Sequence, residues 1–224
     1  MKRVLDVLLV LSSLPVTLPL IGLVALWIVL DGSGSVIHAQ VRVGRGGREF
    51  LMHKFRTLYA DREGGATVTP EGDPRITRPG QFLRRWRLDE LPQLFDVLRG
   101  VMSLVGPRPE RPQHLRGIPA GVRQTVYSVR PGLTGPAAID FLAEDDYLAT
   151  VADPVDAYCR ILLPEKLRLE REYVERRSAL TDLRILALTL PRVLSAKARR
   201  RSRAMIEQIA AAHGSVTTVR RRRG

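Results

Sequence analysis

Two adjacent carboxylates, Asp89 and Glu90, stand beside an arginine in the segment Arg87-Leu88-Asp89-Glu90-Leu91. An ionised aspartate can attack phosphorus and form an acyl-phosphate intermediate. A second carboxylate can hold Mg²⁺, which keeps most of its waters and bridges substrate phosphates. This pattern predicts phosphoryl-transfer chemistry, with Asp89 and Glu90 as the catalytic and metal-binding residues. For such a pair taken alone, a helix start that carries two acids is the alternative interpretation.

Arginines near this pair could bind phosphate. Arg87 precedes the two acids, and Arg108 lies in Gly106-Pro107-Arg108-Pro109, on a backbone stiffened by two prolines. Guanidinium groups bind phosphate oxygens through two parallel hydrogen bonds. We therefore expect both arginines to contact substrate phosphate. We also expect Asp89 to cap the helix that follows it, where the partial positive charge of the helix start favours bound anions. That helix should end at Gly100.

The chain begins with an apolar run from Val7 to Leu30 that contains no charged side chain. At about 1.5 Å per residue, a helix of this length reaches across a hydrocarbon core of about 30 Å. Pro15 and Pro19 predict that the helix breaks within the bilayer. Basic residues favour the cytoplasmic side, and they flank the run at both ends. These residues are Lys2 and Arg3 before it, and Arg42, Arg45, Arg48, Lys54 and Arg56 after it.

The flanking charges favour a re-entrant helix, which enters the bilayer, breaks near its two prolines and returns to the same face. A kinked single span and a cleaved signal peptide are the alternatives. Residues 1–34 form the first unit, which ends in a turn rich in glycine and serine. The next unit, 35–195, is predicted to be the catalytic domain, and 196–224 a basic tail.

The fold class predicted for this chain is α+β and mostly helical. Residues 36–43 and 50–58 flank a glycine-rich turn and predict a small β-hairpin. Residues 60–79 form a long loop that is either a lid over the site or an idle excursion. Apolar periodicity predicts further helices over 81–87, 156–177 with a break near Pro164, and 180–194.

Charge and composition limit the partners. The 224 residues carry a formal charge of +13, which implies an anionic partner such as nucleic acid, anionic lipid or a phosphorylated substrate. Aromatic residues make up only 5% of the chain, with no basic and aromatic stacking platform and no zinc-ligand spacing, so we expect no nucleic acid. The arginine clusters after Lys197 predict a solvated, partly disordered end, or one attracted to anionic lipid. A single cysteine, Cys159, excludes an internal disulfide.

From Lys2 to about Leu194 the sequence resembles the bacterial sugar transferases, and more specifically the monotopic polyprenyl-phosphate phosphoglycosyl transferases. Each matching segment alone is weakly specific, but their order and spacing together are highly specific. The segments are 31–36, Gln40-x-Arg42-x-Gly44, Lys54-Phe55-Arg56-Thr57, Leu88 to Leu94, Met102 to Glu110, Arg130-Pro131-Gly132-x-Thr134-Gly135, Leu163-Pro164-x-Lys166-Leu167 and Asp182-Leu183-x-Ile185-Leu186.

The resemblance implies a reaction at the cytoplasmic face of the bacterial inner membrane. A sugar 1-phosphate would pass from a UDP-sugar to a polyprenyl phosphate such as undecaprenyl phosphate, with release of UMP, to begin the assembly of a surface glycan. Asp89 would be the nucleophile that forms a covalent phosphosugar intermediate, and Glu90 would support Mg²⁺ binding. Basic residues assigned to substrate phosphate are Lys54, Arg56, Arg87, Arg108 and Arg130.

Three departures from the family pattern stand out. Leu18 precedes Pro19 where Ser-Pro is expected, Val101 replaces an acid, and Pro136 begins a segment that differs after Thr-Gly. The chain is similar to the minimal form of the family, without the several spanning helices of larger members. A basic membrane-tethered binding or scaffold protein without catalysis is the alternative function. The transferred sugar and the oligomeric state stay open, and a homodimer is compatible with the amphiphilic anchor.

Overall fold

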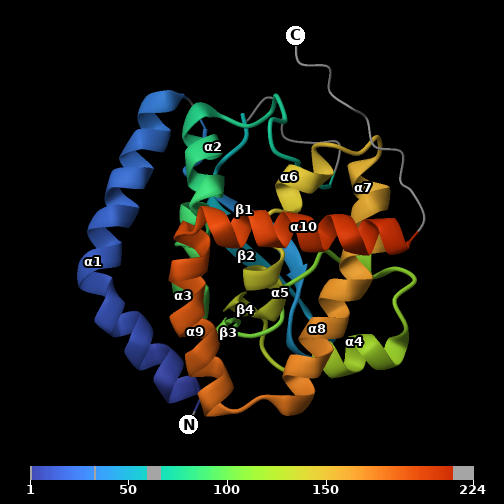
Figure 1. The fold of residues 1–224 in the computed structure, drawn as a ribbon. Coiled ribbons are helices and arrows are strands. Elements are labelled where there is room, and N and C mark those ends of the chain that lie inside the picture. Colours follow the sequence, from blue (N-terminus) through green and yellow to red (C-terminus); the bar gives the residue numbers. More distant parts are fainter. Residues whose placement is uncertain (1, 33, 60–66, 214–224) are drawn as a thin grey trace.

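The computed structural model describes residues 2–32, 34–59 and 67–213. In this part of the chain, helices predominate and surround two small sheets of two strands each (Figure 1). This arrangement confirms the predicted α+β, mostly helical class.

The N-terminal helix α1 (Lys2–Asp31) is continuous through Pro15 and Pro19, so the predicted break at these prolines is wrong. Instead, α1 bows away from the rest of the molecule (Figure 1). The hydroxyls of Ser13 and Thr17 donate to the carbonyls of Val10 and Ser13, at 2.8 and 3.1 Å. Hydroxyl groups that bond to carbonyls of the preceding turn favour helix bending, so the bend has a local cause besides the prolines.

Both ends of α1 are fixed to the same globular body. Near its start, Arg3 donates to the Leu98 carbonyl at 2.7 Å, and the buried Asp6 accepts a 2.7 Å hydrogen bond from Ser103 Oγ. Near its end, Arg56 donates to the Ile28 carbonyl at 3.3 Å. These contacts fix the two ends of the bow to one rigid unit.

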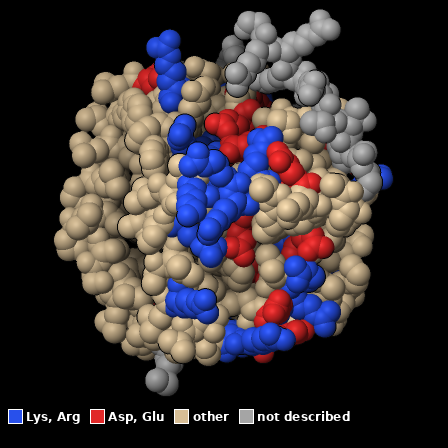
Figure 2. Space-filling view, viewed as in Figure 1, with Lys and Arg blue, Asp and Glu red and all other residues tan. Residues whose placement is uncertain are grey.

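The outer side of α1 is apolar. The helix is long and apolar enough to cross a membrane, and only 11% of its most apolar stretch is buried. Val16 and Leu23 are 74% and 66% exposed. Figure 2 shows few charged side chains on the side that α1 forms, whereas basic and acidic groups intermingle over the centre of that face. Such a surface suits lipid better than water.

The predicted hairpin is confirmed. Strands β1 (Ile37–Val43) and β2 (Glu49–Phe55) pair antiparallel, with Val43 opposite Glu49. The turn between them includes Gly46 and Gly47 at φ values of 70° and 75°, which L side chains rarely adopt. Strand β2 of this hairpin contributes Met52 and Lys54 to the lining of the charged cavity described below.

Helix α2 (Arg78–Arg85) begins at Thr77, whose Oγ1 accepts a 3.0 Å hydrogen bond from the Gly80 amide. A 3₁₀ turn, η3 (Leu88–Glu90), follows, and α3 (Gln93–Arg99) comes next. Asp89 therefore lies in a separate turn and does not cap α3, whose cap position is occupied by Pro92, so that prediction is wrong. Gly100, at φ 83°, ends α3 as predicted.

Two short strands, β3 (Ser103–Val105) and β4 (Gly132–Thr134), pair in parallel. The Gly106 amide donates to the Thr134 carbonyl at 2.9 Å. A Cβ added at Gly132 would lie 2.1 Å from the Gly106 nitrogen, so only glycine allows this approach. The Gly-Pro-Arg-Pro and Arg-Pro-Gly-x-Thr-Gly motifs therefore pack against each other.

Most of the remaining helices form the largest buried core, beneath the C-terminal helix (Figure 1), whereas Ile185 belongs to a second core with Val10 and Val97. The predicted helix over 180–194 is confirmed, and that over 156–177 contains a π-helical turn just before Pro164. The elements are α4 (Ala120–Val126), α5 (Pro136–Asp140), α6 (Glu144–Leu148), α7 (Pro154–Ala157), the π turn (Tyr158–Leu162), α8 (Leu163–Arg176), α9 (Ala179–Leu194) and α10 (Ala196–Ala212).

Helix α10 packs on the core. Ile206 is fully buried, and the buried Ser202 accepts a 3.1 Å hydrogen bond from the Ala143 amide. The prediction that this end is partly disordered is therefore wrong up to Ala212, although Lys197, Arg200 and Arg201 are exposed to solvent. Residues 214–224 lie outside the described part of the chain.

Candidate active site

The turn η3 is positioned by an unusual backbone conformation. Arg87, just before it, has φ 57° and is the one non-glycine residue at positive φ in the described ranges. Such residues cost free energy and cluster at functional sites, where surrounding contacts hold them. Here Arg87 also donates to Glu90 Oε1 at 3.2 Å, which closes the turn on itself. The buried side chains of Asp89 and Glu90 both line one cavity as a result.

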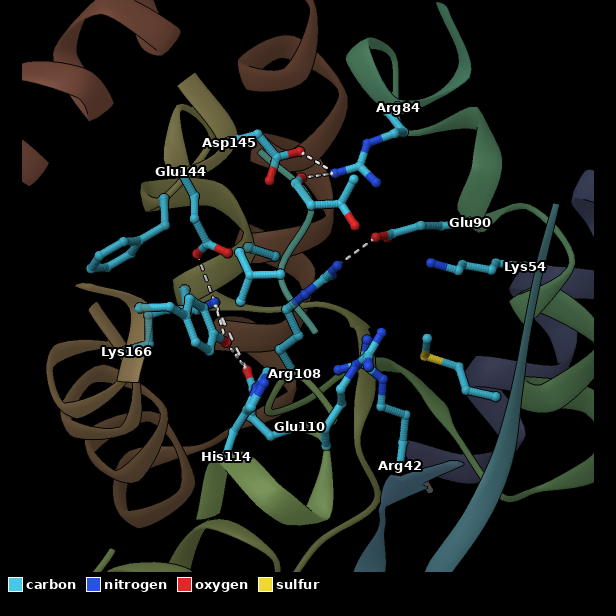
Figure 3. A pocket seen from close by; sticks show the side chains of 18 of the residues that line it. Arg42, Lys54, Arg84, Glu90, Arg108, Glu110, His114, Glu144, Asp145 and Lys166 are labelled. Carbon is cyan, nitrogen blue, oxygen red and sulfur yellow. Dashed lines mark hydrogen bonds and ion pairs between the residues drawn. The ribbon is translucent and has the colours of Figure 1, made fainter. Parts of the chain in front are cut away.

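This cavity, which we call the dyad cavity after the pair Asp89 and Glu90, opens to solvent and encloses about 970 Å³ of space when its open mouth is included. Among the described residues, seven basic and five acidic side chains line it, so its net charge is positive and favours an anionic ligand. Figure 3 shows those that it labels, among them Lys54, Glu90 and Arg108, converging from several elements. The basic residues are Arg42, Lys54, Arg84, Arg87, Arg108, Arg111 and Lys166, and the acidic ones are Asp89, Glu90, Glu110, Glu144 and Asp145.

Glu90 is held by two arginines. Arg108 extends across the cavity and donates to Glu90 Oε1 at 2.7 Å (Figure 3). Burial raises the pKa of Glu90, but attraction to Arg108 and Arg87 outweighs it and brings the pKa to about 2. Glu90 is therefore ionised throughout the physiological range, and its second oxygen, Oε2, accepts no hydrogen bond from the described residues.

Among the five acids that line the cavity, Asp89 is the one whose carboxylate accepts no hydrogen bond from the described residues. It is 8% exposed, and its Oδ1 has no hydrogen-bond partner in the described part of the protein. Burial, and then repulsion from Glu90, raise the pKa of Asp89 to about 6, although Lys54 and Arg84 oppose this. At neutral pH this carboxylate is ionised and poorly solvated, which are the properties of an activated nucleophile.

Lys54 and Arg84 supply positive charge beside Asp89. Burial lowers the pKa of Lys54 to about 8, while attraction to Asp89 raises it. Lys54 therefore remains largely protonated at neutral pH. Arg84, on α2, is fixed by a 2.9 Å ion pair with Asp145 and a 2.6 Å hydrogen bond to the Thr69 carbonyl. The cations that the sequence assigned to phosphate at Lys54, Arg87 and Arg108 thus converge on this cavity.

Two predicted phosphate-binding residues lie elsewhere. Arg56 is buried against the end of α1 and does not line the dyad cavity. Arg130 donates to the Gly100 carbonyl at 2.7 Å and lines a different hollow, near Arg45 and Arg48. The structure gives both residues contacts outside the dyad cavity.

The far wall of the cavity holds a buried network that the sequence interpretation missed. Tyr158, aimed inward from the π turn, donates to Glu110 Oε1 at 2.7 Å. Lys166 donates to Tyr158 at 3.1 Å and to Glu144 at 2.7 Å (Figure 3). Burial raises the pKa of Glu110, but attraction to Lys166 brings it to about 2. Glu110 and Lys166 both lie in matched family segments, which was the available signal for them.

Arg42 is another residue that was missed. Its guanidinium lines the cavity floor and donates to the Pro109 carbonyl at 3.1 Å, so it also fixes the segment that carries Arg108. Burial lowers the pKa of Arg42, partly offset by Glu110. The alternation of side chains along β1 did not indicate that Arg42 points inward, but its place in the matched segment Gln40-x-Arg42-x-Gly44 was an available signal.

The donor set suits a magnesium ion that is shared with substrate. In the described chain, no cluster of three or more histidine, cysteine or acidic residues could hold a metal alone. However, the dyad presents the unpartnered Oδ1 of Asp89 beside the second oxygen of Glu90. Mg²⁺ typically takes one or two carboxylates and completes its shell with waters and substrate phosphates. The residues fit such an ion.

Comparison with known proteins identifies the family. Residues 1–196 match the family model for bacterial sugar transferases. The chain is 38% identical over 198 residues to a UDP-glucose:undecaprenyl-phosphate glucose-1-phosphate transferase of Caulobacter vibrioides, covering 87% of this chain and 70% of that one. It is 38% identical over 184 residues to the enzyme of the same name in Xanthomonas campestris pv. campestris, covering 80% and 36%.

A third relative acts on a different sugar. The chain is 42% identical over 143 residues to a UDP-N-acetylgalactosamine-undecaprenyl-phosphate N-acetylgalactosaminephosphotransferase of Aeromonas hydrophila, covering 62% of this chain and 33% of that one. The chain thus spans about a third of the length of the Xanthomonas and Aeromonas relatives. On the match of its family model and on its relatives, this chain belongs to the bacterial sugar transferase family.

Proposed function

We propose that this protein transfers a sugar 1-phosphate from a UDP-sugar to undecaprenyl phosphate and releases UMP. The observation that carries this proposal is Asp89: a buried carboxylate with an unpartnered oxygen, in a cavity of net positive charge. The printed functions of the Caulobacter and Aeromonas relatives support the substrate classes. Because these relatives differ in their sugar, the identity of the sugar is left open.

In the first half-reaction, a carboxylate oxygen of Asp89 attacks the phosphorus that bears the sugar. A bond forms between Asp89 and that phosphorus, and the bond from phosphorus to the oxygen that bridges the two phosphates breaks. The electron pair leaves on UMP. Arg87 and Arg108, both already directed at this region, are placed to bind the phosphate oxygens on which negative charge accumulates.

In the second half-reaction, an oxygen of the undecaprenyl phosphate monoester attacks the same phosphorus. The bond to Asp89 breaks, its electron pair returns to the carboxylate, and the product is a pyrophosphate-linked lipid. No net proton transfer is needed if the acceptor phosphate is fully ionised. A covalent intermediate allows a water-soluble donor and a membrane-bound acceptor to use one nucleophile in turn.

The Mg²⁺ ion, when bound, would neutralise phosphate charge and make the UMP phosphate a better leaving group. Asp89 and Glu90 would hold it. Arg108 and Arg87 keep Glu90 ionised and fixed in direction, so that its remaining oxygen is available to the ion without rearrangement.

We further propose that α1 is re-entrant and that the cavity lies at the cytoplasmic face of the bacterial inner membrane. Both ends of α1 are bonded to one body, through Asp6 at the start and Arg56 at the end. A helix that crossed the bilayer would place these ends on opposite faces. This pattern of contacts supports a helix that enters and leaves on the same side.

The test is incubation of the purified protein with a panel of UDP-sugars and Mg²⁺, with and without undecaprenyl phosphate. Without acceptor, we expect a phosphosugar adduct on Asp89, which mass spectrometry of peptides can locate, together with one equivalent of UMP. With acceptor, UMP release should become continuous. An Asp89→Asn variant that turns over at a near-normal rate would remove Asp89 as the nucleophile.

A further inference from the structure

A second cavity lies directly beside the dyad cavity. It has about 1090 Å³ of free space, and Arg84, Arg87 and Asp145 line both cavities. The 2.9 Å ion pair between Arg84 and Asp145 therefore stands at the boundary between them. A ligand in the second cavity would lie next to the groups that surround Asp89.

The second cavity has an apolar wall that leads to α1. Ile76, Phe82, Leu142 and Val193 contribute to its lining. The ring of Phe82 lies 5.6 Å from the ring of Trp27 on α1, and Phe82 is 46% exposed. Helices α1 and α2 lie side by side at this point (Figure 1). The apolar wall is thus continuous with the lipid-facing surface of the N-terminal helix.

The same cavity carries an excess of positive charge. Arg84, Arg85, Arg87 and Arg199 line it, against Glu71 and Asp145. Asp145 is paired with Arg84, and Glu71 lies 3.5 Å from Arg199. Arg85 is exposed and forms no ion pair or side-chain hydrogen bond within the described residues. Arg199 bonds chiefly to Asp146, and Glu71 also attracts Arg85, but the four basic groups outnumber the two acids and the exposed Arg85 is available to an anion.

We infer that this second cavity binds the acceptor, a phosphate monoester on a long apolar chain. The phosphate would lie near Arg85 and Arg87, the first apolar units against Phe82 and Leu142, and the rest of the chain along α1 in the bilayer. This inference rests on the proposed function. It places the acceptor on the other side of the Arg84–Asp145 pair from the water-soluble donor.

The combination of groups selects this occupant. A nucleotide has no long apolar part for the wall that begins at Phe82. An ordinary phospholipid carries a phosphate diester with one charge, whereas a monoester carries up to two and bonds more strongly to Arg85 and Arg87 together. Because Arg87 lines both cavities, a phosphate bound to it would lie at the edge of the dyad cavity. One of its oxygens would attack the phosphorus on Asp89, with the electron pair of the broken bond returning to the carboxylate.

The experiment separates the two half-reactions in full-length protein reconstituted into phosphatidylcholine nanodiscs. The variants are Arg85→Gln and Leu142→Asn. The control is Arg78→Gln, because Arg78 is an exposed arginine of the same helix that does not line the cavity. Adduct formation is measured with donor alone, and transfer is measured against the concentration of undecaprenyl phosphate.

We expect the KM for undecaprenyl phosphate to rise about tenfold in Arg85→Gln, the effect of losing one charge-assisted hydrogen bond at a partly exposed site. It should also rise in Leu142→Asn. The donor KM and the yield of adduct should stay at wild-type values in both, and Arg78→Gln should match wild type throughout.

The outcomes are distinct. If wild-type protein forms no adduct, the proposed function and this inference both fail. If adduct forms normally and neither variant changes the acceptor KM, the inference alone is overturned. A rise in the donor KM instead would assign the cavity to the nucleotide sugar. Nanodiscs that contain phosphatidylglycerol test the lipid alternative: inhibition of wild type that Arg85→Gln abolishes would show that a diester lipid occupies the cavity, against our assignment.

Discussion

Replacing Asp89 by asparagine is expected to stabilise the protein while it removes activity. The folded structure raises the pKa of Asp89 from an ordinary value of 3.8 to about 6, mainly by burial and secondarily by repulsion from Glu90. This difference corresponds to about 3 kcal/mol of unfavourable free energy for the ionised side chain above pH 6. Asparagine is nearly the same size and carries no charge, so it avoids this cost.

The sign of the pH dependence follows from proton binding. Between pH 3.8 and about 6, the folded protein holds a proton on Asp89 that the unfolded chain has lost. The contribution of Asp89 to the free energy of unfolding therefore falls as pH rises through this range, and it is constant above about pH 6. The advantage of Asp89→Asn should be about 3 kcal/mol at pH 8 and about half of that at pH 5.

Equilibrium urea unfolding in detergent, followed by the fluorescence of Trp27 and Trp86, measures this difference. Glu49→Gln, which removes an exposed carboxylate on β2, is the control and should show no such pH dependence. An advantage of Asp89→Asn that is the same at pH 5 and pH 8 would refute the reasoning, because effects of the amide group itself do not change with pH. The same samples should form no phosphosugar adduct.

Three further predictions follow from the site and from α1. Glu90→Gln should lower the pKa of Asp89, because repulsion from Glu90 raises that pKa. In a pH–rate profile of UMP release, the acid limb should therefore move below pH 6. An unmoved limb would contradict this coupling. EDTA should stop UMP release and added Mg²⁺ should restore it, whereas full activity in chelator would remove the metal role of the dyad. Asp6→Ala should lower the free energy of unfolding by about 2 to 4 kcal/mol, because the Ser103 hydroxyl and the Leu104 amide lose their partner. Urea unfolding measures this loss, with Asp31→Ala, at an exposed position, as the control. A loss no larger than that of the control would argue against this anchor.

Local patterns predicted the elements well where each element is determined by its own residues. The hairpin follows from alternating side chains around a glycine turn, and the end of α3 follows from Gly100, which adopts positive φ. The dyad and Arg108 could be placed in one site because the chemistry of their side chains is complementary. The structure brings Glu90 and Arg108 to 2.7 Å, and Asp89 lines the same cavity.

Features that depend on distant contacts could not be predicted. Arg87 adopts a left-handed conformation that its type does not favour, and the contact with Glu90 accompanies it. Arg56 has the same charge as Lys54 and lies two residues away, yet it contacts the end of α1, because neighbours in the hairpin have different surroundings. The composition of the arginine-rich end suggested that this segment is exposed to solvent. However, Ser202 and Ile206 lie one turn apart on α10 and form a buried stripe.

The attachment of α1 at both ends has a consequence for biogenesis. Helix α1 precedes in the sequence the groups that secure it, Arg56 and Ser103, so it leaves the ribosome before they do. The bend has causes within α1 itself, but until about residue 104 has emerged and folded, the contacts that hold both ends of α1 to one body cannot form. The orientation that the insertion machinery first gives to α1 must therefore stay reversible until the rest of the protein captures it.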